Sequence, residues 1–270
     1  MVFGRNSVIF LLFPSSIVAL TSPGLPFPTP VACPSDIPFI RTADARTGQL
    51  SPKEDSYIST RASNVLPGAW QTYFQNVLAT SLATNPTHLA AAVSSSQSVF
   101  PKLGIAVSGG SYRAALFGAA VLSSLDARNQ TAARQTGTGG LLQAASYLSG
   151  LSGGAWLVTS LAQANFPTIP DLTFPPSAQV NSGLGNAAFG GWLAQFDLGN
   201  PGPTANDTQR YVAAIFNEIA PKFATGLPVT ITDFWSKALS RHFVNGTTAQ
   251  NILMEGSHGA GVLFSDIAKV

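Results

Sequence analysis

Two glycine-rich turns constrain the fold of this chain more than any other feature. The first spans residues 108–111 (SGGS) and the second spans 150–154 (GLSGG). An apolar, strand-like run precedes each turn and a helix-like run follows it. Repetition of strand, glycine turn and helix is typical of parallel strands joined by helices. We therefore expect an α/β fold with a mainly parallel central sheet and flanking helices.

The second turn has the pattern G-x-S-x-G, which is typical of a nucleophile elbow. In such an elbow the glycines allow the backbone to crowd around a strained serine, here Ser152. The Ser152 hydroxyl would then lie at the N-terminus of a helix, where free N–H groups and the helix dipole favour developing negative charge. The pattern is short, and a plain strand-to-helix turn is the alternative in a chain with 25 glycines.

The first turn has the features of an oxyanion hole. Backbone N–H groups at Gly109 and Gly110, with that of Gly153 after the candidate nucleophile, would bind the negative oxygen of a tetrahedral intermediate. Arg113 follows in the first turn of the next helix, where a cation opposes the helix dipole. A bound phosphate or carboxylate would explain this position, and an ordinary surface arginine is the alternative. Together the turns predict serine-dependent acyl transfer on an anionic ester.

Other classes of function find little support in the sequence. A dinucleotide-binding loop would need a glycine where Ser111 stands, and no G-x-x-x-x-G-K-[ST] motif is present. The net charge of +2, without a Lys/Arg cluster, gives no indication of nucleic-acid binding. The histidines do not have metal-ligand spacing, and the chain has one cysteine. We therefore expect no metal, no cofactor and no nucleic-acid partner. The histidines are His88, His242 and His258.

Residue patterns also predict the elements around the turns. Ser51 as N-cap, Pro52 at the first helical position and Glu54 three residues after the cap predict a helix start. This helix would run to about Asn64. The apolar run 103–107 predicts a buried parallel strand, and 141–150 leads into the serine turn. Further helices are expected at 70–83, 89–98, 113–125, 155–164, 209–224 and 232–242, and loops at 126–140 and 167–203.

The first 49 residues differ in composition from the rest of the chain. Residues 1–20 combine a positive start with an apolar run, as a secretory signal peptide does, and 21–49 form a proline-rich arm. Three N-glycosylation sequons, at Asn129, Asn206 and Asn245, also favour a secreted or cell-surface glycoprotein. No run of 18 or more apolar residues follows the N-terminus, so a polytopic membrane protein is not expected.

Residues 101–116 and 140–158, which contain the two turns, closely resemble the fungal lysophospholipase/phospholipase B family. That family shares its catalytic domain with cytosolic group IV phospholipases and is akin to patatins. The resemblance extends over about residues 30 to 245 and includes Cys33-Pro34, the segment 50–54 with Arg61, and the segment 227–240. It implies that residues 50–270 are the N-terminal part of a lysophospholipase catalytic domain.

The resemblance implies a Ser–Asp dyad that works without histidine. Ser152 matches the nucleophile, Gly109 and Gly110 match the oxyanion loop, and Arg113 matches the arginine that holds the substrate phosphate. The implied substrates are lysophospholipids and diacyl phospholipids at a membrane or micelle interface. The implied products are a fatty acid and a glycerophospho compound, and no cofactor takes part.

The chain departs from the family pattern at two places. Ser111 stands where the family usually has a third glycine, and a positive φ there would add about 1–2 kcal/mol of strain. The family's dyad aspartate lies downstream in an Asp-Gly context, but none of the nine aspartates here precedes glycine. We therefore expect a truncated product or fragment, nearly inactive alone, with the partner of Cys33 in the missing part.

Two other functions remain open at this level. The order Ser152, then Asp197 or Asp233, then His242 or His258 would allow a Ser–Asp–His esterase, although Arg113 has no role in that mechanism. The apolar composition also suits a catalytically inactive lipid-binding remnant.

Overall fold

The computed structural model of the chain describes residues 48–80, 100–174, 191–194, 196–202 and 204–243, with the single residues 32, 35 and 46. The expected signal peptide, the helix predicted at 89–98, Cys33 and Asn245 lie outside the described residues. His88 and His258 also lie outside them.

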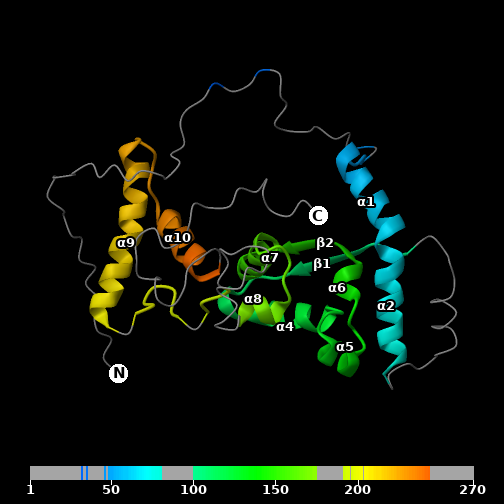
Figure 1. Cartoon of the computed structure of the whole chain (residues 1–270). Coiled ribbons are helices and arrows are strands. Elements are labelled where there is room, and N and C mark those ends of the chain that lie inside the picture. The colour runs from blue at the N-terminus through cyan, green and yellow to red at the C-terminus, as the bar shows by residue number, and fades with distance from the viewer. Residues whose placement is uncertain are drawn as a thin grey trace, which may run out of the picture.

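A two-stranded parallel sheet lies at the centre of the described structure (Figure 1). It pairs β1 (Leu103–Val107) with β2 (Ala145–Gly150). Leu103 is opposite Ala145 at one end, and Val107 is opposite Gly150 at the other. The two glycine turns therefore begin side by side at the carboxyl edge of the sheet. Parallel strands with flanking helices confirm the α/β fold that the sequence predicts.

Each strand leads through its glycine turn into a helix. β1 is followed by α4 (Ser111–Leu125), and β2 by α7 (Gly153–Gln163), so both helices begin about two residues before their predicted starts. Their apolar faces pack together over the sheet. Gly118 allows the close approach, because a Cβ there would lie 2.6 Å from the Val107 side chain. The fully buried part of this core is formed by Ala115, Ala119, Leu122, Leu157 and Leu161.

The segment that connects α4 to β2 is more helical than predicted. The loop expected at 126–140 contains α5 (Gln130–Thr136), and α6 (Leu141–Ala144) precedes β2. The prediction was wrong because the composition, averaged over the whole segment, hid a short helix-forming run at 131–134 (TAAR). The glycines that suggested a loop stand after this helix, where Gly137 and Gly140 adopt positive φ.

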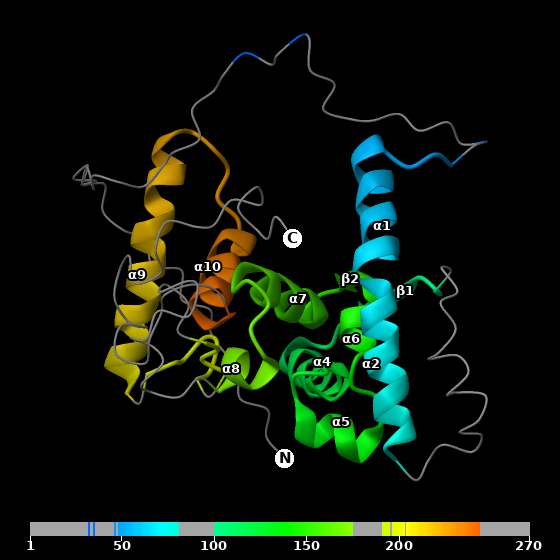
Figure 2. The same cartoon turned by 45° about the vertical axis from the view of Figure 1, so that its right-hand side comes forward.

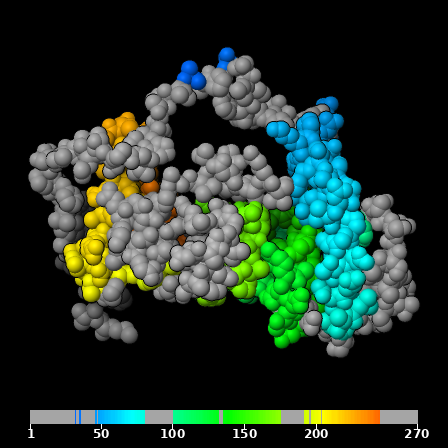
Figure 3. Space-filling view, in the orientation of Figure 1, coloured from blue at the N-terminus to red at the C-terminus, as the bar shows by residue number. Residues whose placement is uncertain are grey.

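Helices α1 (Pro52–Asn64) and α2 (Leu66–Leu78) form a continuous ridge down one side of the molecule (Figure 3). The Ser51 hydroxyl accepts a hydrogen bond from the Glu54 N–H at 3.1 Å, which confirms the predicted N-cap. The Glu54 carboxylate accepts from the Tyr147 hydroxyl at 3.0 Å instead of completing a capping box. α2 begins four residues before the predicted helix at 70–83.

Helix α1 is fastened to the segment that begins β2. The Tyr57 hydroxyl donates to the Ser146 carbonyl at 2.7 Å. The Arg61 guanidinium donates to the carbonyls of Gln143 and Ala145, each at 2.8 Å. None of the residues of α1 is itself buried, so these polar contacts carry much of its attachment.

A helical hairpin occupies the opposite side of the sheet from α1 and α2 (Figures 1 and 2). It consists of α9 (Ala205–Ala224) and α10 (Ile231–Phe243), which run in opposite directions. The short α8 (Ile169–Thr173) lies within the predicted loop at 167–203, and part of that loop lies outside the described residues. Among the described helices, none combines the length and apolar character needed to cross a membrane.

An aromatic cluster fastens the hairpin to the two central helices. Phe243, at the end of α10, packs against Tyr112 of α4 and Trp156 of α7 with ring centroids 5.3 and 5.1 Å apart. Trp192 covers the same ring at 5.0 Å, and its indole N–H donates to the Ser160 hydroxyl. The base of the hairpin therefore lies directly behind the helices that follow the glycine turns.

Candidate active site

The turn at the end of β2 holds Ser152 in a strained backbone conformation. Ser152 has φ 52° and ψ −119° and is exposed immediately before α7. Positive φ is unfavourable for a residue with a Cβ atom, and such strain clusters at functional sites. Glycines permit the crowding, because a Cβ on Gly150 would overlap the Gly154 carbonyl and one on Gly154 would overlap the Val107 carbonyl. This is the geometry of a nucleophile elbow.

The oxyanion-hole candidate lies directly against this serine. A Cβ added to Gly109 would lie 3.0 Å from the Ser152 Cβ and 3.7 Å from its Oγ. On the other side, a Cβ added to Gly153 would overlap the Ser111 carbonyl. The fold therefore brings together two turns that are far apart in the sequence. At Gly153 only a residue without a side chain allows this approach, and at Gly109 an added Cβ would make a tighter contact than most side chains make.

The groups expected to carry the chemistry are free within the described part of the chain. The backbone N–H groups of Gly109, Gly110 and Gly153 donate no hydrogen bond there, and the Ser152 hydroxyl makes none. Gly109 and Gly110 are exposed beside the serine. Unused donors next to a hydroxyl at a helix N-terminus can stabilise negative charge that develops on a bound carbonyl.

Arg113 lies two residues into α4 and is exposed. Within the described residues it makes no ion pair and no hydrogen bond. A cation in the first turn of a helix is unfavourable unless an anion compensates it. The structure therefore leaves Arg113 available for an anionic ligand, which is the condition that the sequence interpretation requires.

Ser111 has the strained backbone conformation that the sequence analysis considered for this position. Its φ is 58°, in the left-handed region that glycine tolerates best. The replacement of glycine by serine therefore costs local backbone energy at the first residue of α4. The Ser111 carbonyl packs against Gly153, so this strained residue is part of the contact between the two turns.

The Ser–Asp–His alternative is not assembled among the described residues. His242 is buried, its Nδ1 lies 2.8 Å from the Ala238 carbonyl, and burial lowers the pKa of its imidazole. Asp197 uses its carboxylate to accept backbone N–H groups of its own loop, and Asp233 pairs with a lysine of α9. No hydrogen bond in this part of the chain joins these groups to Ser152.

Two neighbours of the site were not singled out from the sequence. Leu151, beside the serine, is 71% exposed, so an apolar side chain borders the hydroxyl. Tyr112, beside Arg113, packs on Trp156 at 5.8 Å behind the elbow. Burial, assisted by the negative charge of Asp197, raises the pKa of the Tyr112 hydroxyl to about 12. The only sequence signal for either was its position next to a candidate residue.

The remaining points from the sequence concern two glycosylation sequons and possible metal ligands. Asn206 is exposed in the first turn of α9, and the Asn129 side chain is half-buried and donates to the Ser123 hydroxyl at 2.8 Å. The described residues contain no group of three or more His, Cys, Asp or Glu side chains placed to hold a metal ion.

The fold and site together define an α/β domain with a strained serine at a strand-to-helix turn and a glycine loop against it. Comparison with known families then identifies it. The model of the lysophospholipase catalytic domain matches residues 103–262, which include both turns and most of the described core. The chain belongs to this family.

Curated relatives carry the corresponding names. The chain is 37% identical to lysophospholipase 1 of Aspergillus fumigatus over 226 residues, which cover 82% of this chain and 32% of that protein. It is 36% identical to lysophospholipase 2 of Candida glabrata over 79% of this chain and 28% of that protein. It is 33% identical to probable lysophospholipase 2 of Schizosaccharomyces pombe over 81% of this chain and 31% of that protein.

The chain thus spans about a third of the length of the curated relatives it matches. No solved structure matched it.

Proposed function

We propose that this chain provides the nucleophile, oxyanion hole and phosphate-binding arginine of a lysophospholipase/phospholipase B. The reaction is hydrolysis of a carboxylic ester in a lysophospholipid or diacyl phospholipid. The observation that carries the proposal is the contact of Gly109 with Ser152, which places unused N–H donors beside a strained serine hydroxyl. The names of the relatives support the choice of ester.

In the proposed mechanism the Ser152 Oγ attacks the ester carbonyl carbon. The carbonyl oxygen becomes an oxyanion and accepts hydrogen bonds from the N–H groups of Gly109, Gly110 and Gly153. Loss of one such donor typically raises the barrier by about 3–4 kcal/mol. The glycerophospho group leaves with a proton, and water then cleaves the acyl-serine to release the fatty acid and regenerate Ser152.

The base in this mechanism is the aspartate of a Ser–Asp dyad. None of the described aspartates hydrogen-bonds to Ser152, so the proposed base is not among the described residues. A serine hydroxyl without a base is a weak nucleophile at neutral pH. Within the described residues Ser152 has no base, so we expect slow turnover by Ser152, with the oxyanion hole and substrate binding supplying the remaining acceleration.

The proposed role of Arg113 is to bind the phosphate of the substrate. Its guanidinium is exposed and uncompensated within the described residues, and it lies in the first turn of α4, the helix that follows the oxyanion loop. Arginine binds phosphate through two parallel hydrogen bonds, whereas lysine acts as a point charge. Replacement by lysine should therefore weaken binding less than replacement by alanine, but should not restore it fully.

Two measurements on the purified 270-residue chain test the proposal. The first follows binding of an ether-linked lysophosphocholine, which cannot be hydrolysed, to the wild type, Arg113→Ala, and the control Arg210→Ala, an exposed arginine of α9. We expect Arg113→Ala alone to weaken binding. The second follows fatty-acid release from lysophosphatidylcholine, which Ser152→Ala should abolish. Release above the protein-free background that Ser152→Ala leaves unchanged would overturn the assignment of the nucleophile.

A further inference from the structure

Exposed apolar side chains gather at the free end of the α9–α10 hairpin. Ile231 is 79% exposed and Phe223 is 64% exposed, although both are large apolar residues. Every residue from 223 to 232 is exposed, which defines the tip as a protruding element. Contiguous apolar surface of this kind usually marks an interaction site. The hairpin-tip patch consists of Phe216, Phe223, Leu227, Val229, Ile231 and Trp235.

The spacing of these residues places them on one stripe of each helix. Phe216 and Phe223 are seven residues apart on α9, and Ile231 and Trp235 are four apart on α10, so each pair shares a helix face. The tip is also remote from the anchored base. Phe243, in the aromatic cluster, is twelve residues beyond Ile231, about 18 Å along the helix. Figures 1 and 2 show the connecting loop at this free end.

Internal contacts hold the tip in one arrangement. The Lys222 ammonium pairs with the Asp233 carboxylate at 2.5 Å across the two helices. The other oxygen of Asp233 accepts from the Thr230 N–H at 2.8 Å. Beneath the patch, Phe216 packs on the half-buried Phe234 with ring centroids 5.6 Å apart. The exposed side chains are therefore presented by a fixed scaffold.

The charges of this region are compensated inside the hairpin. Between residues 216 and 235 the charged residues are Glu218, Lys222 and Asp233. Lys222 and Asp233 pair with each other, and the buried Glu218 pairs with both Arg241 and Lys237 of α10. Each charged side chain here therefore has a partner of opposite sign, and the patch itself consists of uncharged residues. A strongly acidic or basic partner would find no complementary charge here, whereas a neutral hydrocarbon phase needs none.

We propose that the hairpin-tip patch inserts into the surface of an uncharged or zwitterionic lipid aggregate. This inference rests on the proposed function, because a phospholipid substrate is held in micelles or membranes. Phenylalanine and isoleucine gain by leaving water, and a tryptophan such as Trp235 is favoured at the boundary between lipid and water. The hairpin is then the element that docks the domain on its substrate phase.

The test uses the full chain carrying Ser152→Ala, so that the lipid is not consumed. Co-sedimentation with phosphatidylcholine vesicles is measured for this protein and for the same protein with Phe223→Ser and Ile231→Ser. The matched control carries Leu116→Ser and Phe117→Ser, which replace two exposed apolar residues of α4. Because all four residues are exposed, circular dichroism should show unchanged folding. We expect the tip variant to lower the partition coefficient by about tenfold or more and the control to change it little.

Several results would overturn the inference. Equal loss in the tip and control variants would mean general apolar adhesion. Loss of binding when salt rises from 0.1 to 1 M would mean electrostatic attraction, because apolar insertion is not screened. Light scattering without lipid gives a third criterion, since dissociation of an oligomer by the tip substitutions would assign the patch to contacts between copies. The assay needs no hydrolysis and leaves Arg113 intact, so its outcome is separate from the tests of the proposed function.

Discussion

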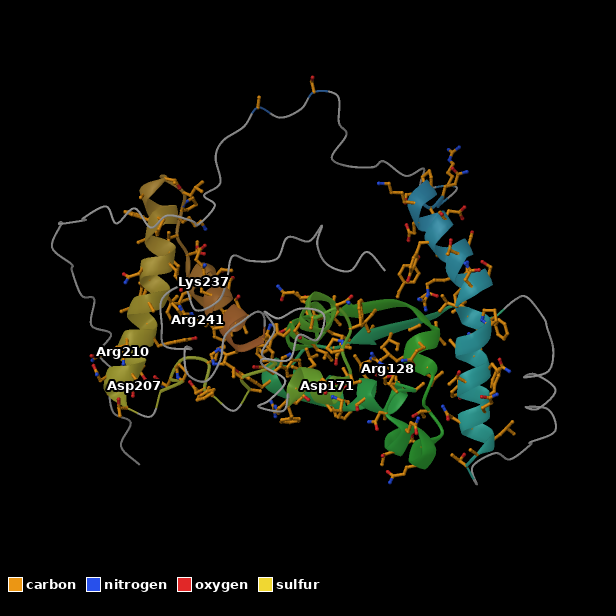
Figure 4. All side chains as sticks on the ribbon, in the orientation of Figure 1. Arg128, Asp171, Asp207, Arg210, Lys237 and Arg241 are labelled. Carbon is orange, nitrogen blue, oxygen red and sulfur yellow. The ribbon has the colours of Figure 1, made fainter. Side chains whose placement is uncertain are left out.

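Two regions of the molecule are built by opposite means. One is the elbow region, which consists of the two glycine turns with β1, β2, α4 and α7, and the other is the helical hairpin of α9 and α10. In the elbow, backbone packs on backbone, and there is no room for a side chain at Gly150, Gly153 or Gly154. In the hairpin, side chains fill the space between helices, and these include the buried ion pair of Glu218 with Arg241 at 2.5 Å. Figure 4 shows Arg241 and Lys237 extending from α10. The first region is sensitive to added volume, the second to lost charge.

The two regions therefore differ in how a substitution damages them. The proposed catalytic role requires a serine at a fixed position relative to N–H donors, and close backbone packing fixes that position with few degrees of freedom. A hairpin needs only to stay folded and to present its outer surface. Substitutions should therefore damage the two regions by distinct mechanisms, and four predictions test this distinction.

The largest expected effect is that of Arg241→Met in the hairpin. Arg241 is fully buried, so its removal leaves the Glu218 carboxylate buried without its closest cation. Breaking a buried ion pair in this way typically costs about 3–5 kcal/mol. The free energy of unfolding, measured in urea, should fall by this amount. The double variant Arg241→Met with Glu218→Leu should recover most of the loss, and failure to recover would show that packing rather than charge dominates.

The second prediction is that Gly154→Ala destabilises the elbow region by about 3 kcal/mol, the upper end for overpacking. Its Cβ would overlap the backbone carbonyls of Val107 and Ser108, which cannot move without distorting the sheet. The matched control is Gly68→Ala in α2, where no atom lies within 4 Å of the added Cβ. The control should stabilise the protein by up to about 1 kcal/mol. Similar destabilisation by both substitutions would contradict the steric argument.

The third prediction concerns the pH dependence of the hairpin. Burial lowers the pKa of His242 below its ordinary value of 6.5, and the charge of Arg241 acts in the same direction. The unfolded chain therefore binds a proton at this site more readily than the folded one, and stability falls as pH drops below about 6.5. In the His242→Gln variant the melting temperature should change less between pH 7 and pH 5 than in the wild type. Burial raises the pKa of Asp126, but hydrogen bonds from Arg128 and Gln143 outweigh burial and lower it. Because the ordinary pKa of aspartate is about 4, this residue affects stability only nearer pH 4.

The smallest expected effect is that of Ser111→Gly. Glycine relieves the positive φ of residue 111 and should stabilise the fold by up to about 1 kcal/mol. Ser59→Gly, at an exposed position inside α1, is the control and should destabilise by about 0.5 kcal/mol. Thermal unfolding of both variants measures the difference. A loss of stability in both would show that the Ser111 side chain contributes more than its strained backbone costs.

The elbow region was largely predictable from the sequence because its signals are local. A glycine turn after an apolar run fixes strand, turn and helix in order, and β1, α4, β2 and α7 follow that order. The Ser51 cap of α1 was predictable for the same reason. The contact of Gly109 with Ser152 required only that two parallel strands be neighbours.

The hairpin was predictable as two helices but not as a packed unit. Charged residues such as Glu218 and Arg241 ordinarily indicate a solvated face, so no local pattern indicated that they would be buried together. The start of α9 at Ala205 was missed because its signal is a Thr204 cap that accepts from the Asp207 N–H, preceded by proline-rich sequence. Pairing between distant side chains lies beyond local pattern.

The attachment of α1 to the start of β2 has a consequence for the order in which the chain acquires structure. A helix of 13 residues with none buried is marginal in isolation. Its Tyr57 and Arg61 contacts join residues 82 to 89 positions apart, so they can form only after β2 has been synthesised. Although α1 is synthesised before β2, we expect it to become stable only after β2 has formed.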